Sequence, residues 1–386
     1  MNKHFATLYT FSYMAIGCFT PLIAQYLSAI GLDGTQIGIV TATGTLVAIF
    51  AVAIWGRVYN RASAKARVIE LLCLGAIIFN AALMFSSSII PVIILFGIMY
   101  FFQSPVMSLV DSYTVLGQYD NFGGKRAWGA VGFAAGVFIA GKLADAISLK
   151  SIFGLYEICF AITIVVLFLI HRRLHKDAKA EPEIHVDKSK KYRDLCKSRR
   201  VVQIIICAFF LGGTNVANNT YFSFLYIQGG GTIAGVGICM LLMVGSEVPF
   251  MAWSKRLSDR FTMEKVLFAA MIISVIRFCI YGLGLPWWVL MIMFFTQGAV
   301  NGIILVEFVR CAARYAPEGC SSLAISAYYI IGSNISTIIC QFVGGIILDS
   351  FGASGVYMFF GLFNLVGVIL YFSFGLYKNN YPEKNR

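Results

Sequence analysis

One long polar stretch, residues 171–200, divides an otherwise apolar chain of 386 residues into two parts of similar length. It holds eleven Lys or Arg and five Asp or Glu, whereas runs of about 20 mostly apolar residues recur on both sides of it. A helix needs about 20 apolar residues to cross the hydrocarbon of a bilayer. The pattern therefore predicts two groups of membrane-spanning helices joined by a polar linker.

The composition excludes an ordinary soluble domain. Hydrophobic residues make up 59% of the chain and charged residues only 12%, which leaves too few polar side chains to cover a surface in water. An outer-membrane β-barrel would show short alternating segments instead of long apolar runs. The ten cysteines form no CxxC and no metal-binding spacing, so we expect neither a disulfide framework nor a metal site.

We expect an all-α membrane protein with twelve transmembrane helices in two six-helix bundles, residues 1–170 and 201–377, with a tail at 378–386. The first apolar run, from Phe5, is long enough to span a membrane and is not read as a cleavable signal. The twelve helices are expected near 5–27, 37–56, 68–87, 90–115, 127–147, 151–170, 202–226, 235–253, 265–284, 287–309, 321–346 and 355–376.

The two halves carry similar short motifs at corresponding places. Residues 56–61 follow the second expected helix and residues 255–260 the eighth, while 141–145 and 345–349 both run from Gly to Asp near the ends of the fifth and eleventh. Such internal repeats are typical of transporters built from two related bundles, with the substrate site at mid-depth where the repeats meet. We therefore predict pseudo-twofold symmetry.

The net charge of +12 could suggest nucleic-acid binding, but its distribution favours a membrane orientation. Of the 30 Lys and Arg, 27 fall in alternate loops or at the termini, the exceptions being Lys142, Lys150 and Arg277. Basic residues concentrate in cytoplasmic loops of membrane proteins. We expect a multi-pass protein of the plasma membrane, the inner membrane in a bacterium, with both termini cytoplasmic and no nucleic-acid partner.

These motifs resemble the major facilitator superfamily over nearly the whole chain. The basic segments after helices 2 and 8 are similar to its G-x-L-A-D-R-x-G-R/K motif, although the first copy has Asn60 where Asp is usual. Further stretches resemble the phenylpropionate-permease-like branch and its relative lactose permease: 20–22, 26–27, Gly31, 36–38, 55–56 and 122–133. The resemblance implies the major facilitator fold and proton-coupled symport of a solute such as an oligosaccharide.

Charged residues inside spanning helices are costly and need a reason. Glu247 and Arg277 fall near mid-depth of neighbouring helices that run in opposite directions, so we expect them to form an ion pair. The pair is either structural or part of a substrate or proton site. The resemblance favours a role of this pair in the substrate or proton site, because Arg277 falls on the helix 9 arginine of lactose permease.

Three more intramembrane acids have candidate partners. The resemblance implies that Arg126 contacts substrate, as the matching helix 5 arginine does in lactose permease. Asp111 is the nearest acid, and the two form either a substrate clamp or a pair at a cytoplasmic helix end. We expect Glu157 to pair with Lys142 in a structural role.

Near the cytoplasmic side we expect a gating network of salt bridges that form in one access state and break in the other. Its residues are Asp259, Glu307, Arg310 and Arg314, with Arg61.

Uncharged polar residues recur at helical spacing in three expected helices. Amide and phenol groups suit a hydroxyl-rich or amphipathic solute, although hydrogen bonds between helices would use the same residues. The substrate-binding candidates are Asn215, Asn219 and Tyr226 in helix 7, Gln297 and Asn301 in helix 10, and Tyr329 and Asn334 in helix 11.

All four histidines lie outside the expected helices. Lactose permease has a histidine and a glutamate in helix 10 where this chain has Gln297 and Asn301, so proton coupling must use carboxylates whose pKa is raised by desolvation. We predict a monomeric secondary transporter, coupled to H⁺, that takes up a saccharide, a nucleoside or an aromatic acid. Drug efflux by proton exchange is the alternative within transport, and a non-transporting receptor or scaffold is the alternative outside it.

No nucleophile–base pair, Walker loop or metal cluster is recognisable in the sequence, so we expect neither an enzyme nor a nucleotide-driven pump, and no cofactor.

Overall fold

The computed structural model describes residues 2–116, 122–174, 195, 198–317 and 320–378. Within these ranges every regular element is a helix and there is no strand. A helix satisfies all of its interior backbone hydrogen bonds by itself, which is what a chain surrounded by hydrocarbon requires. The predicted all-α class is confirmed.

The described residues of the first part of the chain form eight helices. They are α1 (Asn2–Phe19), α2 (Ile23–Ala29), α3 (Gly34–Arg61), α4 (Lys65–Met84), α5 (Ile89–Gln103), α6 (Val106–Leu116), α7 (Phe122–Ala146) and α8 (Ser151–Leu174). The breaks between α1 and α2 and between α5 and α6 fall at Pro21 and Pro105, where the missing N–H interrupts the helical hydrogen bonds. Each of these pairs of helices forms one span, His4–Ala29 and Ile89–Thr114.

The second part of the chain forms α10 (Arg199–Gln228), α11 (Ile233–Phe261), α12 (Met263–Tyr281), α13 (Trp287–Tyr315), α14 (Ser321–Ala327), a π-helix η1 (Tyr328–Ile335) and α15 (Ser336–Ser373). In the described residues, ten helical segments are long and apolar enough to cross a membrane. The last of them, Leu323–Ser373, bends at Gly352, where φ is 67°, so it contributes two spans. The 19-residue α12 adds the twelfth, and the predicted number of spans is confirmed.

The chain divides into two compact units. Unit 1 contains Met1–Ile184, Asn219–Leu241 and Gln341–Ser350, and unit 2 contains His185–Asn218, Leu242–Cys340 and Phe351–Arg386. The division therefore does not follow the polar linker alone. Part of α10, the start of α11 and a segment of α15 pack with the N-terminal helices in unit 1.

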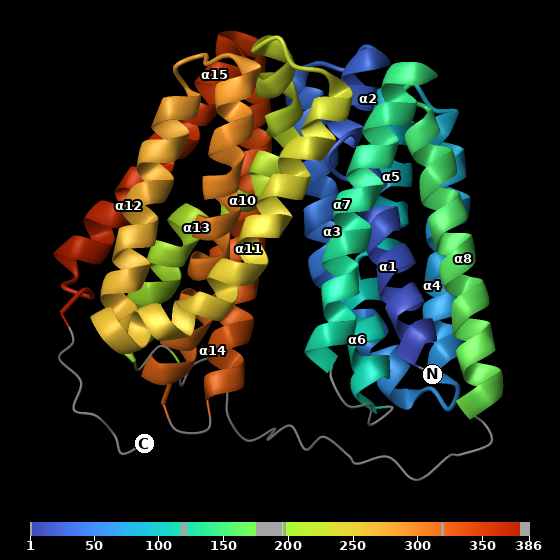
Figure 1. Ribbon diagram of the computed structural model, residues 1–386, viewed down its shortest axis with the longest axis horizontal. Coiled ribbons are helices and arrows are strands. Elements are labelled where there is room, and N and C mark those ends of the chain that lie inside the picture. Colours follow the sequence, from blue (N-terminus) through green and yellow to red (C-terminus); the bar gives the residue numbers. More distant parts are fainter. Residues whose placement is uncertain (1, 117–121, 175–194, 196–197, 318–319, 379–386) are drawn as a thin grey trace. The chain divides into compact units, whose positions relative to one another are not determined.

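Close helix packing repeats in the two halves. In unit 1, α1 packs along α7 and α8, and α5 packs against α3 and α4 (Figure 1). A methyl group at Gly132 in α7 would lie 2.1 Å from the carbonyl oxygen of Thr10 in α1. In unit 2, a methyl group at Gly212 in α10 would lie 2.2 Å from the carbonyl oxygen of Gly332 in η1. These glycines let backbones touch, which is how helices associate tightly in lipid.

The basic motifs after the second and eighth spans are helical rather than loops. The α3 helix continues to Arg61 and α11 to Phe261, and Thr262 alone separates α11 from α12. Because charge ends an apolar run, the sequence pattern predicts loops at these two places. Basic side chains in the last turn of a helix interact favourably with the helix dipole, so the helices continue beyond the apolar run.

Candidate functional site

Arg277 in α12 is a fully buried cation in unit 2, with a relative exposure of 1%. Its Nη2 donates a hydrogen bond to Oδ1 of Asn215 in α10 over 3.4 Å, and its guanidinium carbon lies 4.4 Å from the ring centre of Phe278. Its Nε and Nη1 are buried without a hydrogen-bond partner in the described part of the chain. Because buried N–H groups normally find acceptors, these two donors make Arg277 a candidate ligand-binding residue.

A polar network surrounds this arginine in unit 2. Tyr357 in α15 donates to Asn218 Oδ1 over 2.8 Å, and Asn218 Nδ2 is buried without a partner among the described residues. Asn364 joins three helices, because it accepts from Thr214 of α10 over 2.7 Å and donates to Ser274 of α12 over 2.9 Å. These bonds hold α10, α12 and α15 in register around Arg277, so the guanidinium is preorganised.

The predicted ion pair between Glu247 and Arg277 is not formed in the structure. Glu247 lies 15 residues before Thr262 and Arg277 lies 15 residues after it, so the two residues lie at similar distances from the turn that joins their helices. Arg277, however, turns to α10. The backbone of Glu247 packs on α13, where a methyl group at Gly302 would lie 2.7 Å from its carbonyl oxygen. The side chain of Glu247 is half-buried.

Several of the predicted substrate-binding residues form no hydrogen bond with Arg277 among the residues that the structure describes. Gln297 in α13 is buried and donates to Asn301 Oδ1 over 3.4 Å, while its Oε1 has no partner in the described residues. Tyr329 is 44% exposed in η1, and Asn334 in the same π-helix is half-buried. π-Helical turns are frequent at functional sites. The structure thus brings Asn215 to Arg277 and Gln297 to Asn301.

Two other predicted residues, Asn219 and Tyr226, belong to unit 1. Asn219 is half-buried. Tyr226 is 1% exposed, and its ring packs so tightly that a methyl group at Gly231 would lie 2.2 Å from it. Tyr226 therefore has a packing role in the structure that spacing along α10 did not reveal.

The acids of the N-terminal helices also have partners other than those predicted. Asp111 accepts a hydrogen bond from Tyr9 over 2.8 Å, and the side chain of Arg126 lies outside the described residues, so the Asp111–Arg126 pair remains a prediction. Glu157 is contacted by the amide of Asn80 at 3.4 Å, and the ammonium of Lys142 lies 6.0 Å from the ring centre of Phe138. The predicted Glu157–Lys142 pair is not formed.

Two residues of the predicted gating network, Glu307 and Arg310, contact each other in unit 2. Glu307 is fully buried and accepts hydrogen bonds from Ser254 and Ser258 of α11, and Arg310 lies 3.0 Å from it. Asp259 and Arg61 are exposed. Glu307 therefore links α11 to α13 through two serines that the sequence pattern does not indicate.

Arg314 pairs with Glu264 instead of Glu307. Its Nη1 lies 3.7 Å from Glu264 Oε1, and that carboxylate also accepts from the hydroxyl of Tyr315. Glu264 is 1% exposed and lies in the first turn of α12. Sequence reasoning missed this residue, although an acid in the first turn after a short connection is a recognised helix-start signal.

Replacing Glu307 with Leu is expected to lower the free energy of unfolding by about 2–3 kcal/mol, because two buried serine hydroxyls lose their acceptor. Glu307→Gln keeps an acceptor and should cost less than about 1 kcal/mol. Thermal unfolding in detergent measures both, with Asp259→Ala as a control at an exposed acid. Equal stability of the Leu and Gln variants would show that these hydrogen bonds contribute little.

Two aspartates in unit 1 cap the starts of helices that are far from them in the sequence. Asp349 accepts from the N–H groups of Gly34 and Thr35 over 2.6 and 2.8 Å and from the Thr35 hydroxyl over 2.6 Å. Asp145 accepts from the N–H of Ala234 over 3.0 Å. These aspartates end the two Gly-to-Asp repeat motifs, and they meet the N-termini of α3 and α11, where free N–H groups and the helix dipole attract an anion.

The chain is similar to known transporters in sequence. It is 29% identical over 370 residues to the maltose permease of Geobacillus stearothermophilus, covering 95% of this chain and 92% of that protein. It is 27% identical over 378 residues to the transporter YwbF of Bacillus subtilis (strain 168), with the same coverage of 95% and 92%.

Solved structures show the same fold. The nucleoside transporter NupG superposes with a TM-score of 0.79 at 16% identity, covering 99% of both chains. A bacterial homologue of the human lysosomal transporter Spinster, in an inward-facing and unoccupied conformation, superposes with a TM-score of 0.71 at 11% identity, covering 96% of this chain and 95% of that one.

The family model described as the MFS_1 like family matches residues 3–359, almost the whole described structure. This match agrees with the twelve spans, the repeated glycine contacts and the buried polar network around Arg277. The chain therefore belongs to the MFS_1 like family and is a multi-pass membrane protein that transports a small solute.

Proposed function

We propose that the protein is a proton-coupled symporter for a hydroxyl-rich solute, a saccharide in the first place, and that Arg277 binds it. The observation that carries this proposal is the buried guanidinium with two donors lacking partners among the described residues, beside Asn215. Sugar hydroxyls accept hydrogen bonds from guanidinium and exchange bonds in both directions with amides. A buried site of this kind discriminates strongly against molecules that cannot pair with it.

Further polar side chains are candidate contacts for the solute. Gln297 has a buried Oε1 without a partner in the described residues, next to Asn301. Tyr329 and Asn334 are exposed and half-buried in η1, so packing in unit 2 does not fully enclose their side chains. The names of two relatives, a maltose permease and a nucleoside transporter, both denote polyhydroxylated solutes. Saccharides and nucleosides therefore come before aromatic acids as candidate substrates.

Glu247 is the proposed proton-carrying group. It lies in the middle of α11, half-buried, and no ion pair involves it among the described residues. Glu264 and Glu307, by contrast, are held by arginine and by hydroxyl donors. A carboxylate must change protonation to couple transport to H⁺, and an unpaired one is freer to do so than one held in a salt bridge.

We further propose that transport proceeds by alternating access in the plasma membrane, with both termini cytoplasmic and with a monomer as the working unit. The contacts of Glu307 with Ser254 and Ser258 of α11, and of Glu264 with Arg314, join different helices and are candidates to form in one access state and break in the other. Such pairs are suitable two-state elements because each residue can be rehydrated when the contact opens.

Proteoliposomes containing the purified protein test this function. With an acidic exterior, radiolabelled maltose should accumulate inside above its external concentration, and a protonophore should abolish the accumulation. Glu247→Gln should lose accumulation but keep exchange of labelled for unlabelled sugar, because a group that must titrate has been made permanently neutral. Glu157→Gln is the control.

Accumulation that needs Na⁺ instead of a pH gradient would contradict H⁺ coupling. Uptake of a nucleoside without uptake of maltose would contradict the saccharide assignment.

A further inference from the structure

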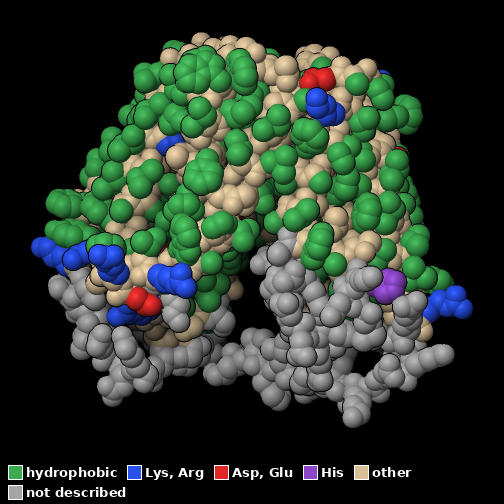
Figure 2. Space-filling model, in the orientation of Figure 1, with side chains coloured by type: hydrophobic (Ala, Val, Ile, Leu, Met, Phe, Trp, Pro, Cys, Tyr) green, Lys and Arg blue, Asp and Glu red, His purple; other side chains and the backbone are tan. Residues whose placement is uncertain are grey.

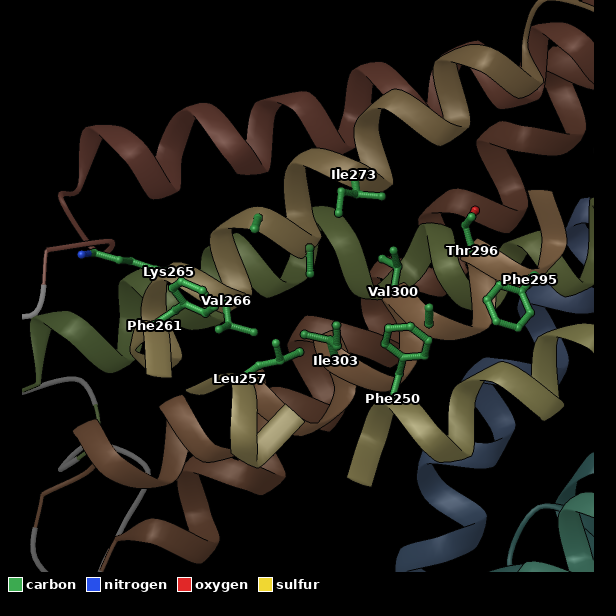
Figure 3. A pocket seen from close by; sticks show the side chains of 13 residues that line it. Phe250, Leu257, Phe261, Lys265, Val266, Ile273, Phe295, Thr296, Val300 and Ile303 are labelled. Carbon is green, nitrogen blue, oxygen red and sulfur yellow. The ribbon is translucent and has the colours of Figure 1, made fainter. Parts of the chain in front are cut away.

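An apolar groove of about 500 Å³ lies on unit 2 where α11, α12 and α13 meet. In Figure 3 the labelled side chains follow one another from Lys265 and Phe261 at one end to Thr296 and Phe295 at the other. Phe250 and Leu257 come from α11, Ile273 from α12 and Ile303 from α13. The groove is open along its length, since Phe261, Ile273 and Phe295 are 52%, 48% and 49% exposed.

The wall of the groove presents hydrocarbon and aromatic rings. The hydroxyl of Thr296 donates to the carbonyl of Met293 in its own helix over 2.6 Å, so it needs no partner from an occupant. A ligand with hydrogen-bonding groups would leave them unsatisfied against this wall. The chemistry of the groove therefore fits an extended hydrocarbon chain.

One end of the groove is basic. Lys265 is exposed in the first turn of α12, and its amino group points away from the groove in Figure 3. The guanidinium carbon of Arg260 lies 5.4 Å from the ring centre of Phe261, which forms the same end. Figure 2 shows Lys and Arg side chains gathered at the lower left, where α11 ends and α12 begins in Figure 1. The neighbouring Glu264 is buried and held by Arg314 and Tyr315, so its charge is already compensated.

The length of the groove matches one membrane leaflet. From Lys265 to Ile273 the groove follows eight residues of α12, which is about 12 Å of helix. One leaflet contributes about 15 Å of hydrocarbon, half of the bilayer core. The groove is therefore long enough for a single acyl chain that starts at the Lys265 end and reaches about the middle of the membrane.

We propose that this groove is a binding site for an anionic phospholipid. One acyl chain lies between α11 and α12 on the floor formed by α13, and the phosphate group contacts Lys265 and Arg260. Basic side chains at the membrane surface attract anionic lipid headgroups, and long Lys and Arg stems reach the headgroup while their methylenes cover apolar surface. The site is independent of the solute site at Arg277.

Native mass spectrometry of the full chain tests the proposal with phosphatidylglycerol and phosphatidylcholine carrying the same acyl chains. The parent protein should retain one phosphatidylglycerol more tightly than phosphatidylcholine. Lys265→Gln should weaken phosphatidylglycerol binding about fivefold, the factor that corresponds to about 1 kcal/mol for a basic side chain at an anionic surface. Lys150→Gln, an exposed lysine of unit 1, is the matched control and should have no effect.

A second variant tests the acyl chain separately. Ala299→Trp fills the groove from α13 and should abolish retention of the lipid, whereas Ile292→Trp, at a position 66% exposed on the same helix, should not. Equal retention of the two lipids by the parent would overturn the proposal. So would an Ala299→Trp protein that binds phosphatidylglycerol as the parent does.

Discussion

Replacing Arg277 with Gln is expected to weaken binding of the transported solute by about 10- to 100-fold while the protein remains folded. A hydrogen bond to a charged group contributes about 1.5–3 kcal/mol, and Arg277 has donors available for such bonds. The guanidinium has no carboxylate partner among the described residues. The substitution therefore leaves no buried carboxylate unpaired, and the protein should still fold. Binding measured by calorimetry, together with the melting temperature, separates the two effects.

Two further variants sharpen this test. Arg277→Lys should also bind weakly, since an ammonium cannot reproduce the planar fork of donors. Ile276→Ala lies on the same helix at a position 53% exposed, outside the polar network around Arg277, so it should bind the solute normally. A folded Arg277→Gln protein with the parent's affinity for maltose and for nucleosides would remove Arg277 from the site.

Replacing Asp349 with Ala is expected to release the segment 341–350 from the start of α3. The carboxylate accepts three hydrogen bonds there, and loss of charge-assisted bonds at a helix start costs about 2 kcal/mol, or roughly a 30-fold change in population. Asp145→Ala removes a single bond of this kind, the one from the Ala234 N–H. It should therefore weaken the contact between Asp145 and the start of α11 by a smaller amount. Distances between spin labels at Ala29 and Ile346, both in unit 1, would report the Asp349 contact.

Asp33→Ala provides the matched control for this experiment. Asp33 caps the same helix through the N–H of Gln36, over 2.7 Å, without contacting residues 341–350. It should weaken the start of α3 locally but leave the label distance unchanged. A label distance in Asp349→Ala identical to that of the parent would show that glycine packing, not the aspartate, holds this contact closed.

The sequence by itself determined the class of the protein, the number of spans and the position of each charge along its helix. Long apolar runs dictate spanning helices because a bilayer offers no other way to satisfy the backbone. Each residue then advances the chain by about 1.5 Å, which is why Glu247 and Arg277 lie at similar distances from Thr262. Resemblance in a few motifs also identified the superfamily.

The tertiary structure alone decided which charges meet. Position along a helix says nothing about the direction in which a side chain leaves the axis, or about which neighbour lies there. Arg277 faces Asn215 rather than Glu247, and Arg314 faces Glu264 rather than Glu307. These choices follow from backbone contacts at small residues, such as Gly302 against the Glu247 carbonyl, which set how each helix is rotated against the next.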